Sequence, residues 1–336
     1  MKKTADALCT KNMSDNEKND TSDDTCDICD VSPAKDTGDV FDSPAIKEPE
    51  HDVYDSPAKI FKKIKTNHTT YYPDPVEKIH HYPEQDSEFV YNMSKIKGNV
   101  VIFNMTTFQR STGLDPREGS DKDAEEIIDV FIKLGFIVDR YDNISKLEMM
   151  EVVESAASNA KKFSCFVCFI LSHGEDGIVF ARDGRVQIKK LTGVFEGSHW
   201  NGKPKLFFIQ ACQGDEYMDG VDCVDAPGRQ SKTITLPSQS DFLYAYSTVS
   251  GFYSWRNTSN GSWFIQTLCQ ILRQHAHELD LLRMLTRLNY YISGRKSNTR
   301  ESETNNKRQI ASIVSQLRKD LYFFPPNGPI DIKNAV

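Results

Sequence analysis

Apolar and polar positions follow two regimes along the chain. From about residue 89 onward, short apolar runs alternate with amphipathic stretches, whereas the residues before it contain few apolar clusters. Short apolar runs indicate buried strands, and apolar residues three or four positions apart indicate helices. The pattern predicts strands at 99–104, 135–141, 163–171, 205–211 and 241–247. It predicts helices at 121–134, 145–160, 262–275 and 278–292.

This order of elements predicts the fold class. Strands that alternate with helices are typical of an α/β fold, so we expect a three-layer α/β/α sandwich with a mostly parallel central sheet. Ser145 and Glu148 have the spacing of a capping box at the start of the second helix. Periodicity alone leaves 309–317 open as a strand or a buried helix. Two polar segments, 213–240 and 294–308, interrupt the pattern.

Charge separates the first 88 residues from the rest. Residues 1–88 hold 11 basic and 20 acidic side chains, a net charge of −9, whereas the remainder is near neutral at +2. A charged tract with few apolar clusters cannot bury enough surface to fold, which predicts a disordered acidic segment over 1–88. Because no basic stripe stands out, we expect no nucleic-acid partner.

The lack of a recognisable targeting signal and the cysteine usage predict a cytoplasmic protein. The N-terminal residues contain no apolar run of the secretory type, and the longest apolar run, 163–171, is far below the ~20 residues of a membrane-spanning helix. We therefore expect no membrane contact. The eight cysteines of a long, non-secreted chain are expected to be free thiols. Cys165 and Cys168 should pack on opposite faces of one strand. No cofactor and no metal site are predicted.

Two predicted strands end in chemically active residues. His173 and Gly174 follow the strand 163–171, and Cys212 follows the strand 205–211. Because reactive groups of parallel sheets gather at the carboxyl ends of strands, His173 and Cys212 could meet there. A cysteine nucleophile needs a nearby base, and His173 could take its proton.

The sequence around Cys212 resembles the caspase family. Residues 210–214 read Gln-Ala-Cys-Gln-Gly, which is similar to the caspase signature, and a histidine lies upstream. Further blocks that resemble executioner caspases are 172–175, 202–206, 241–248, 253–257 and 261–266. The similarity covers roughly residues 90–325. The loop 294–308 departs from it, because it lacks the aromatic residues that executioner caspases carry there.

The resemblance implies roles for individual residues. It makes Cys212 the nucleophile, His173 the base, and the backbone N–H groups of Gly174 and Cys212 the oxyanion hole. It assigns a pocket for the substrate aspartate and neighbouring subsites to a second set of residues. These are Arg117, Gln210 and Arg256 for the aspartate, Tyr253, Ser254 and Trp255 beside it, and Asn257 and Trp263 for the fourth residue before the cut.

Aspartate-rich segments imply activation by cleavage. The pattern Asp-x-x-Asp followed by Ser-Pro-Ala, directly or after one residue, occurs three times near the N-terminus, ending at Asp30, Asp42 and Asp55, and an Asp-x-x-Asp segment that ends at Asp225 lies in the linker 213–240. By the resemblance, an upstream caspase or the protein itself would cut there, with Asp225 favoured in the linker over Asp222 and Asp219. The expected parts are a prodomain at 1–88, a large subunit at 89–225 and a small subunit at 226–336.

The resemblance also implies partners. Protein substrates with Asp-x-x-Asp motifs are expected, and two large–small pairs should associate through the sheet edge of the small subunit. A small subunit that begins Ala226-Pro227 would suit inhibitor-of-apoptosis proteins that capture N-terminal alanine.

Three alternatives remain open at this point. A catalytically silent caspase relative could act as a regulator or decoy, although Cys212 and His173 are intact. A protease of the same broad fold that cuts after Arg, Lys or Asn is disfavoured, because Arg117 and Arg256 suit an anion. An initiator caspase is disfavoured because 1–88 lacks sustained apolar helical periodicity.

Overall fold

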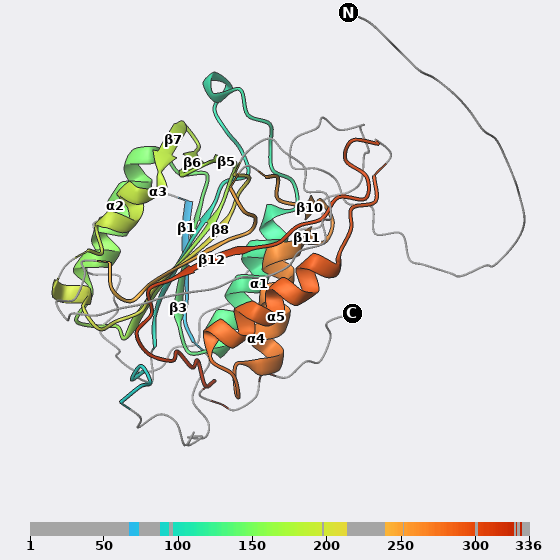
Figure 1. Cartoon of the computed structure of the whole chain (residues 1–336). Coiled ribbons are helices and arrows are strands. Elements are labelled where there is room, and N and C mark those ends of the chain that lie inside the picture. Colours follow the sequence, from blue (N-terminus) through green and yellow to red (C-terminus); the bar gives the residue numbers. More distant parts are fainter. Residues whose placement is uncertain are drawn as a thin grey trace, which may run out of the picture.

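The computed structural model describes residues 67–73, 88–93, 97–196, 198–213, 239–250, 252–299, 302–325, 327 and 330. A seven-stranded sheet forms the middle layer between two groups of helices (Figure 1). The predicted α/β/α architecture is confirmed.

The sheet is parallel in its centre and antiparallel at both edges. Its strand order is β1 (Asn67–Tyr71), β3 (Ile137–Asp142), β2 (Gly98–Asn104), β4 (Cys165–Leu171), β8 (Lys205–Gln210), β9 (Phe242–Tyr246) and β12 (Ser312–Ser315). The strands β2, β4 and β8 are buried along their whole length. This explains why they read as continuous apolar runs rather than as an alternating pattern.

Helices cover both faces of the sheet. On one face lie α1 (Ser120–Lys133), α4 (Trp263–His275) and α5 (Leu281–Gly294), and on the other lie α2 (Lys146–Ser158) and α3 (Ile188–Gly193) (Figure 1). Two separate cores result. Cys165 belongs to the core under α1 and α4, and Cys168 to the core under α2. The predicted packing of these two cysteines on opposite faces is confirmed.

Side-chain hydrogen bonds cap the starts of two helices. Both hydrogen bonds of the predicted capping box between Ser145 and Glu148 are present at the start of α2. Asp280 caps α5 by accepting from the N–H groups of Leu282 and Arg283.

The segment 309–317, which periodicity left open as a strand or a buried helix, contains the edge strand β12.

Several short elements were not predicted. A three-stranded sheet follows His173, and a two-stranded hairpin precedes α4. The unpredicted elements are η3 (Arg110–Thr112), β5 (Gly174–Glu175), β6 (Ile178–Ala181), β7 (Gly184–Gln187), α3, η4 (Ser198–Trp200), β10 (Arg256–Asn257) and β11 (Gly261–Ser262). Strands of two to four residues are too short to show a hydrophobic period.

The strand β1 corrects the prediction of disorder over 1–88. It pairs with β3, and the carboxylate of Asp139 accepts hydrogen bonds from Thr70 at 2.6 Å and Asn99 at 2.7 Å. His68 lies 2.9 Å from the same carboxylate and stacks on Tyr141. Polar contacts therefore hold this strand, which is why apolar patterning does not reveal it. Residues 1–66 and 74–87 lie outside the described residues.

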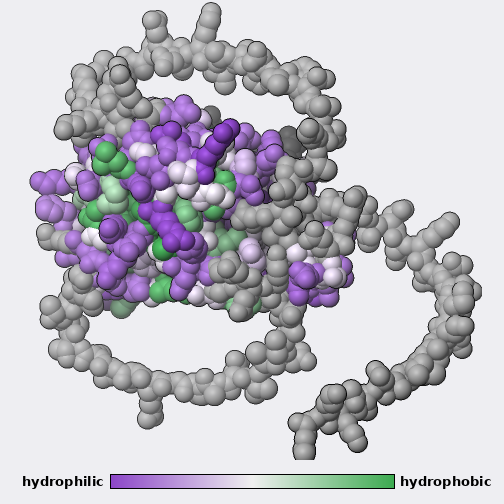
Figure 2. Space-filling model, turned by 90° about the horizontal axis from the view of Figure 1, so that it is seen from above, coloured by the Kyte–Doolittle hydropathy of each residue, from purple (hydrophilic) through white to green (hydrophobic). Residues whose placement is uncertain are grey.

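The surface is dominated by polar side chains. On the face seen in Figure 2, hydrophilic residues cover most of the described area, and hydrophobic residues form smaller patches between them. Among the described residues, none of the helices has the length and apolar character needed to cross a membrane.

Candidate active site

The two chemically active segments leave the sheet side by side. β4 and β8 are parallel neighbours, with Leu171 opposite Gln210 in register. The N–H of Ser172 donates to the carbonyl oxygen of Gln210 at 3.1 Å, so the pairing continues past the strand ends. His173 and Cys212 follow within two residues and are both buried.

Gly174 shows how closely the two segments approach. A Cβ atom added at this residue would lie 2.8 Å from the carbonyl oxygen of Cys212 and 2.8 Å from the Cβ of Ala211. Such distances exclude any side chain at 174 without a backbone shift. The backbone after His173 is therefore packed directly against the residue that carries the thiol.

The ring of His173 is oriented by a backbone carbonyl. Its Nε2 lies 2.9 Å from the carbonyl oxygen of Asp115, and the ring of Phe108 packs against it with 4.9 Å between ring centroids. Since a carbonyl oxygen can only accept, Nε2 carries the hydrogen. In the neutral imidazole the lone pair is then on Nδ1, the atom that can act as a base. Sequence reasoning missed Asp115, and no residue-type signal could reveal it, because any residue supplies a carbonyl.

Gln210 ends β8 with a buried side-chain amide. Its Nε2 lies 2.8 Å from the hydroxyl of Ser254, and within the described part of the chain its Oε1 has no hydrogen-bond partner. The hydroxyl of Ser254 can donate as well as accept. If the amide turns by 180°, Ser254 donates to Oε1 and the NH₂ group is presented to an incoming carboxylate.

Arg117 is buried in the loop that leads into α1. Its Nη1 donates to the carbonyl oxygen of Met105 at 3.1 Å and to the hydroxyl of Ser120 at 2.9 Å. Ser120 in turn donates to Asn104 at the end of β2. A buried guanidinium with a fixed orientation suits the recognition of a carboxylate.

Arg256 approaches the same region from β10. It is buried, and its Nη1 donates to the carbonyl oxygen of Glu118. Gly119 allows this approach, because its φ is +80° and an added Cβ would lie 2.7 Å from the carbonyl oxygen of Asn257. The hairpin of β10 and β11 therefore packs on the loop that carries Arg117.

A buried carboxylate ties α1 to this hairpin. Asp123 accepts from the N–H of Ser262 at 2.9 Å and from Nε2 of Gln266 at 2.8 Å. Burial raises the pKa of Asp123 to about 6, while these hydrogen bonds and the charge of Arg117 act in the opposite direction. The aspartate thus links the start of α4 to the helix that follows Arg117.

The remaining predicted residues lie in the hairpin or directly beside it in the sequence. Trp255 and Trp263 are buried and stack with 5.9 Å between ring centroids. Asn257 accepts from two backbone N–H groups of the turn that follows it. Tyr253 is half-buried beside Ser254. Sequence reasoning missed Gln309, whose side chain accepts from the N–H of Trp255 at 2.9 Å and donates to the carbonyl oxygen of Ser247 at 2.7 Å.

The other described cysteines are chemically quiet. Cys165, Cys168 and Cys269 are fully buried, and burial raises the pKa of all three thiols. They stay protonated at neutral pH and are poor nucleophiles. Cys212 differs in position, because it alone of the four described cysteines lies beyond a strand end, beside a histidine segment.

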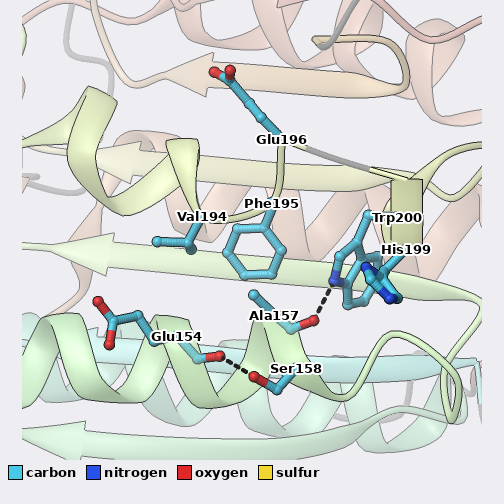
Figure 3. A pocket seen from close by; sticks show the side chains of 8 residues that line it. All are labelled: Glu154, Ala157, Ser158, Val194, Phe195, Glu196, His199 and Trp200. Atoms are coloured by element: carbon cyan, nitrogen blue, oxygen red, sulfur yellow. Dashed lines mark hydrogen bonds between the residues drawn. The ribbon is translucent and has the colours of Figure 1, made fainter.

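Two further features lie apart from these residues. A hollow of about 510 Å³ opens between α2 and the segment after α3 (Figure 3), and none of its lining residues belongs to the predicted site. Within the described ranges no group of three or more His, Cys, Asp or Glu has a metal-binding arrangement.

The predicted cleavage residues Asp30, Asp42, Asp55, Asp219, Asp222 and Asp225 lie outside the described residues.

Comparison with known proteins decides the family. The model of the caspase domain matches residues 97–322, which include every predicted catalytic and substrate-binding residue. The chain belongs to the caspase family. Among curated caspases, it is 38% identical to Caspase-3 of Felis catus over 277 residues, which cover 81% of this chain and 95% of the relative. It is 39% identical to Caspase-7 of Gallus gallus, covering 70% and 80% of the two chains. Caspase-3 of Mesocricetus auratus is 40% identical, covering 68% and 84%.

The strand β1 lies outside the residues that match the caspase domain. The caspase domain match begins at residue 97, and β1 ends at Tyr71. In this caspase, a segment before the family domain therefore adds an edge strand to the central sheet.

Proposed function

We propose that this caspase is a cysteine endopeptidase of the executioner type that cleaves peptide bonds after aspartate. The observation that carries the proposal is the packing of Gly174, directly after His173, against Cys212 at adjoining ends of parallel strands. The similarity to proteins named Caspase-3 and Caspase-7 supports the executioner type.

The chemistry follows from the two reactive side chains. Nδ1 of His173 takes the proton of the Cys212 thiol, and the thiolate attacks the carbonyl carbon of the scissile bond. The N–H groups of Gly174 and Cys212 stabilise the resulting oxyanion. The C–N bond breaks as His173 returns the proton to the leaving amine. His173 then removes a proton from water, which hydrolyses the thioester and releases Cys212.

Specificity for aspartate comes from Arg117, Gln210 and Arg256. Two guanidiniums and an amide NH₂ can bind both oxygens of one carboxylate. A substrate asparagine would leave these buried cations without an anion, at a cost of about 3–5 kcal/mol. Since ~1.4 kcal/mol is a factor of ten, the expected preference for aspartate is on the order of 10² to 10³. This requirement also disfavours cleavage after Arg, Lys or Asn.

The hairpin side of the cleft would bind the residues before the aspartate. Tyr253 and Trp255 suit the second residue before the cut, and Asn257 and Trp263 suit the fourth. Ser254 would position Gln210 through their hydrogen bond. Protein substrates with Asp-x-x-Asp motifs would fit this arrangement.

Activation would require cleavage of the precursor. An upstream caspase, or the protein itself, would cut after Asp225, or else after Asp222 or Asp219, to separate the large subunit, expected at 89–225, from the small subunit at 226–336. Cuts after Asp30, Asp42 or Asp55 would remove N-terminal residues but leave residues 56–88, which include β1, joined to the large subunit. Mass spectrometry of the active protein should find a small subunit beginning at Ala226; a start at none of Ala226, Cys223 or Gly220 would contradict this account. An exposed Ala226 would suit inhibitor-of-apoptosis proteins.

Two copies would associate through β12. This strand pairs with β9 on one side and forms the outer edge of the described sheet on the other. Val314 in β12 and Ile310 before it are exposed hydrophobic residues. An edge strand of this kind can pair with the same strand of a second copy.

Hydrolysis of a short fluorogenic peptide ending in Asp-Glu-Val-Asp tests the proposal. We expect the protein cut at Asp225 to cleave it and the Cys212→Ala variant, cut at the same site, to be inactive. No hydrolysis by the intact-cysteine form would instead support the catalytically silent relative.

A further inference from the structure

Basic side chains gather beside the hairpin side of the cleft, on the loop that follows α5. The guanidinium of Arg295 lies 5.9 Å from the centre of the Trp263 ring, within the range of a cation–π contact. Nη1 of Arg308 donates to the carbonyl oxygens of Gly294 at 3.1 Å and Arg295 at 3.2 Å. In Figure 1 this loop lies at the same end of the molecule as β10 and β11.

These cations differ from other described arginines in their ion pairing. Within the part of the chain that the structure describes, Arg295, Lys296 and Arg308 form no ion pair, whereas Arg140, Arg273 and Arg318 each pair with an aspartate. Arg295 and Lys296 are exposed to solvent, and Arg308 is half-buried. Basic side chains that are exposed in this way attract an acidic ligand.

The candidate cleavage segments of this chain carry the complementary charge. Each of the four segments that end at a favoured cleavage residue, 27–30, 39–42, 52–55 and 222–225, has an acidic residue two or three positions before its first aspartate. These acidic residues are Asp24, Asp36, Glu50 and Asp219, which precede Asp27, Asp39, Asp52 and Asp222, respectively.

The spacing agrees with the position of the basic loop. In the proposed function, Trp263 contacts the first aspartate of the motif. An extended peptide advances about 3.3 Å per residue, so an acidic residue two or three positions earlier lies roughly 7–10 Å beyond it. The loop carrying Arg295 borders Trp263, and long cationic side chains can reach across such a distance.

We propose that Arg295, Lys296 and Arg308 form a binding site for acidic residues that precede the Asp-x-x-Asp motif of a substrate. The inference rests on the proposed function, because it extends the same cleft. The site favours Asp-x-x-Asp motifs that are preceded by acidic residues, in this chain or in other proteins, over motifs that are preceded by neutral residues. Because the pairs are exposed to water, each acidic residue should contribute a few-fold in binding, and salt should weaken the effect.

Two peptides that differ only in the acidic residues before the Asp-x-x-Asp motif test this site. One has the sequence of residues 47–58, and in the other Glu48 and Glu50 are replaced by glutamine. We expect the active protein to cleave the acidic peptide with a kcat/KM several-fold higher, through KM, and this ratio to approach one in 0.5 M salt. The Arg295→Glu/Lys296→Glu variant should lose the preference. The matched control, Lys161→Glu/Lys162→Glu, changes two exposed lysines after α2 and should keep it.

A binding measurement separates this inference from the proposed function. Fluorescence anisotropy of both labelled peptides on the Cys212→Ala protein reports the preference without catalysis. Tighter binding of the acidic peptide, lost in the Arg295→Glu/Lys296→Glu background, supports the basic site even if no peptide is cleaved. Equal affinity of the two peptides at low salt overturns it, even if the Asp-Glu-Val-Asp peptide is hydrolysed.

Discussion

The two sides of the proposed active site, a catalytic side and a substrate side, are built in different ways. On the catalytic side, His173 and Cys212 follow neighbouring parallel strands, and the strand register alone brings their segments together. On the substrate side, Arg256, Trp255 and Trp263 lie in or beside a hairpin of two-residue strands. That hairpin is held by hydrogen bonds to distant segments, including Gln309 and Asp123.

The difference separates what the fold fixes from what can vary. A one-residue change in the register of β4 or β8 would disrupt two buried cores, so the proposed catalytic pair, His173 and Cys212, is tied to the stability of the sheet. The substrate side depends on a few side-chain bonds and on loops, which tolerate substitution. Arg295, in a loop where executioner caspases carry aromatic residues, shows this freedom. We therefore expect substitutions to affect rate on one side and selectivity on the other.

The largest effect should come from the nucleophile. Cys212→Ala should lower kcat by at least ~10³-fold, because no other described cysteine can replace its thiolate. The melting temperature should stay nearly unchanged, since one sulfur atom is removed at a strand end. Thermal denaturation beside the peptide assay checks both values. Residual activity near that of the intact protein would show that the catalytic side lies elsewhere.

Selectivity should fall next when Arg256 is replaced. Arg256→Gln should lower kcat/KM for an aspartate peptide by about 10²-fold, because half of the carboxylate binding is lost. Arg256→Lys should recover only part of it, since an ammonium group lacks the planar pair of donors. Steady-state kinetics with both variants would reveal the order. Equal activity of the Lys variant and the unchanged protein would mean that a positive charge at residue 256 is sufficient to bind the substrate aspartate.

A smaller effect is expected at Gln309, which positions Trp255 by accepting a hydrogen bond from its backbone N–H. Gln309→Ala removes two buried hydrogen bonds and should cost about 1–3 kcal/mol in the free energy of unfolding. KM should rise several-fold while kcat changes little, because the catalytic side is intact. Denaturant unfolding and peptide kinetics measure these quantities. A fall in kcat with unchanged KM would contradict the separation of the two sides.

The smallest effect concerns pH. Burial raises the pKa of Asp123 to about 6 from a usual value of 3.8. Stability contributed by its protonated form is present below about pH 4 and is lost as the pH rises through about 6. The melting temperature of the unchanged protein minus that of Asp123→Asn should therefore be larger at pH 4 than at pH 7. Other carboxyls titrate in both proteins and cancel. A difference independent of pH would contradict this assignment.

The same division governs what the sequence could predict. The buried strands and the long helices were predicted within a few residues, because burial on both faces leaves continuous apolar runs. β1 was missed because the polar side chains of His68 and Thr70 hold it to Asp139. Near the site, Asp115 and Gln309 were missed, since a backbone carbonyl and a bridging amide have no recognisable pattern. The roles of Arg117 and Arg256 came from the family resemblance rather than from spacing.

The central claim is that the two sides together make an aspartate-specific protease. The most direct test is the ratio of kcat/KM for two peptides that differ only in the residue before the cut, aspartate or asparagine, measured with protein cut at Asp225. The account predicts a ratio on the order of 10² or more in favour of aspartate. Efficient cleavage of both peptides at similar rates would contradict it.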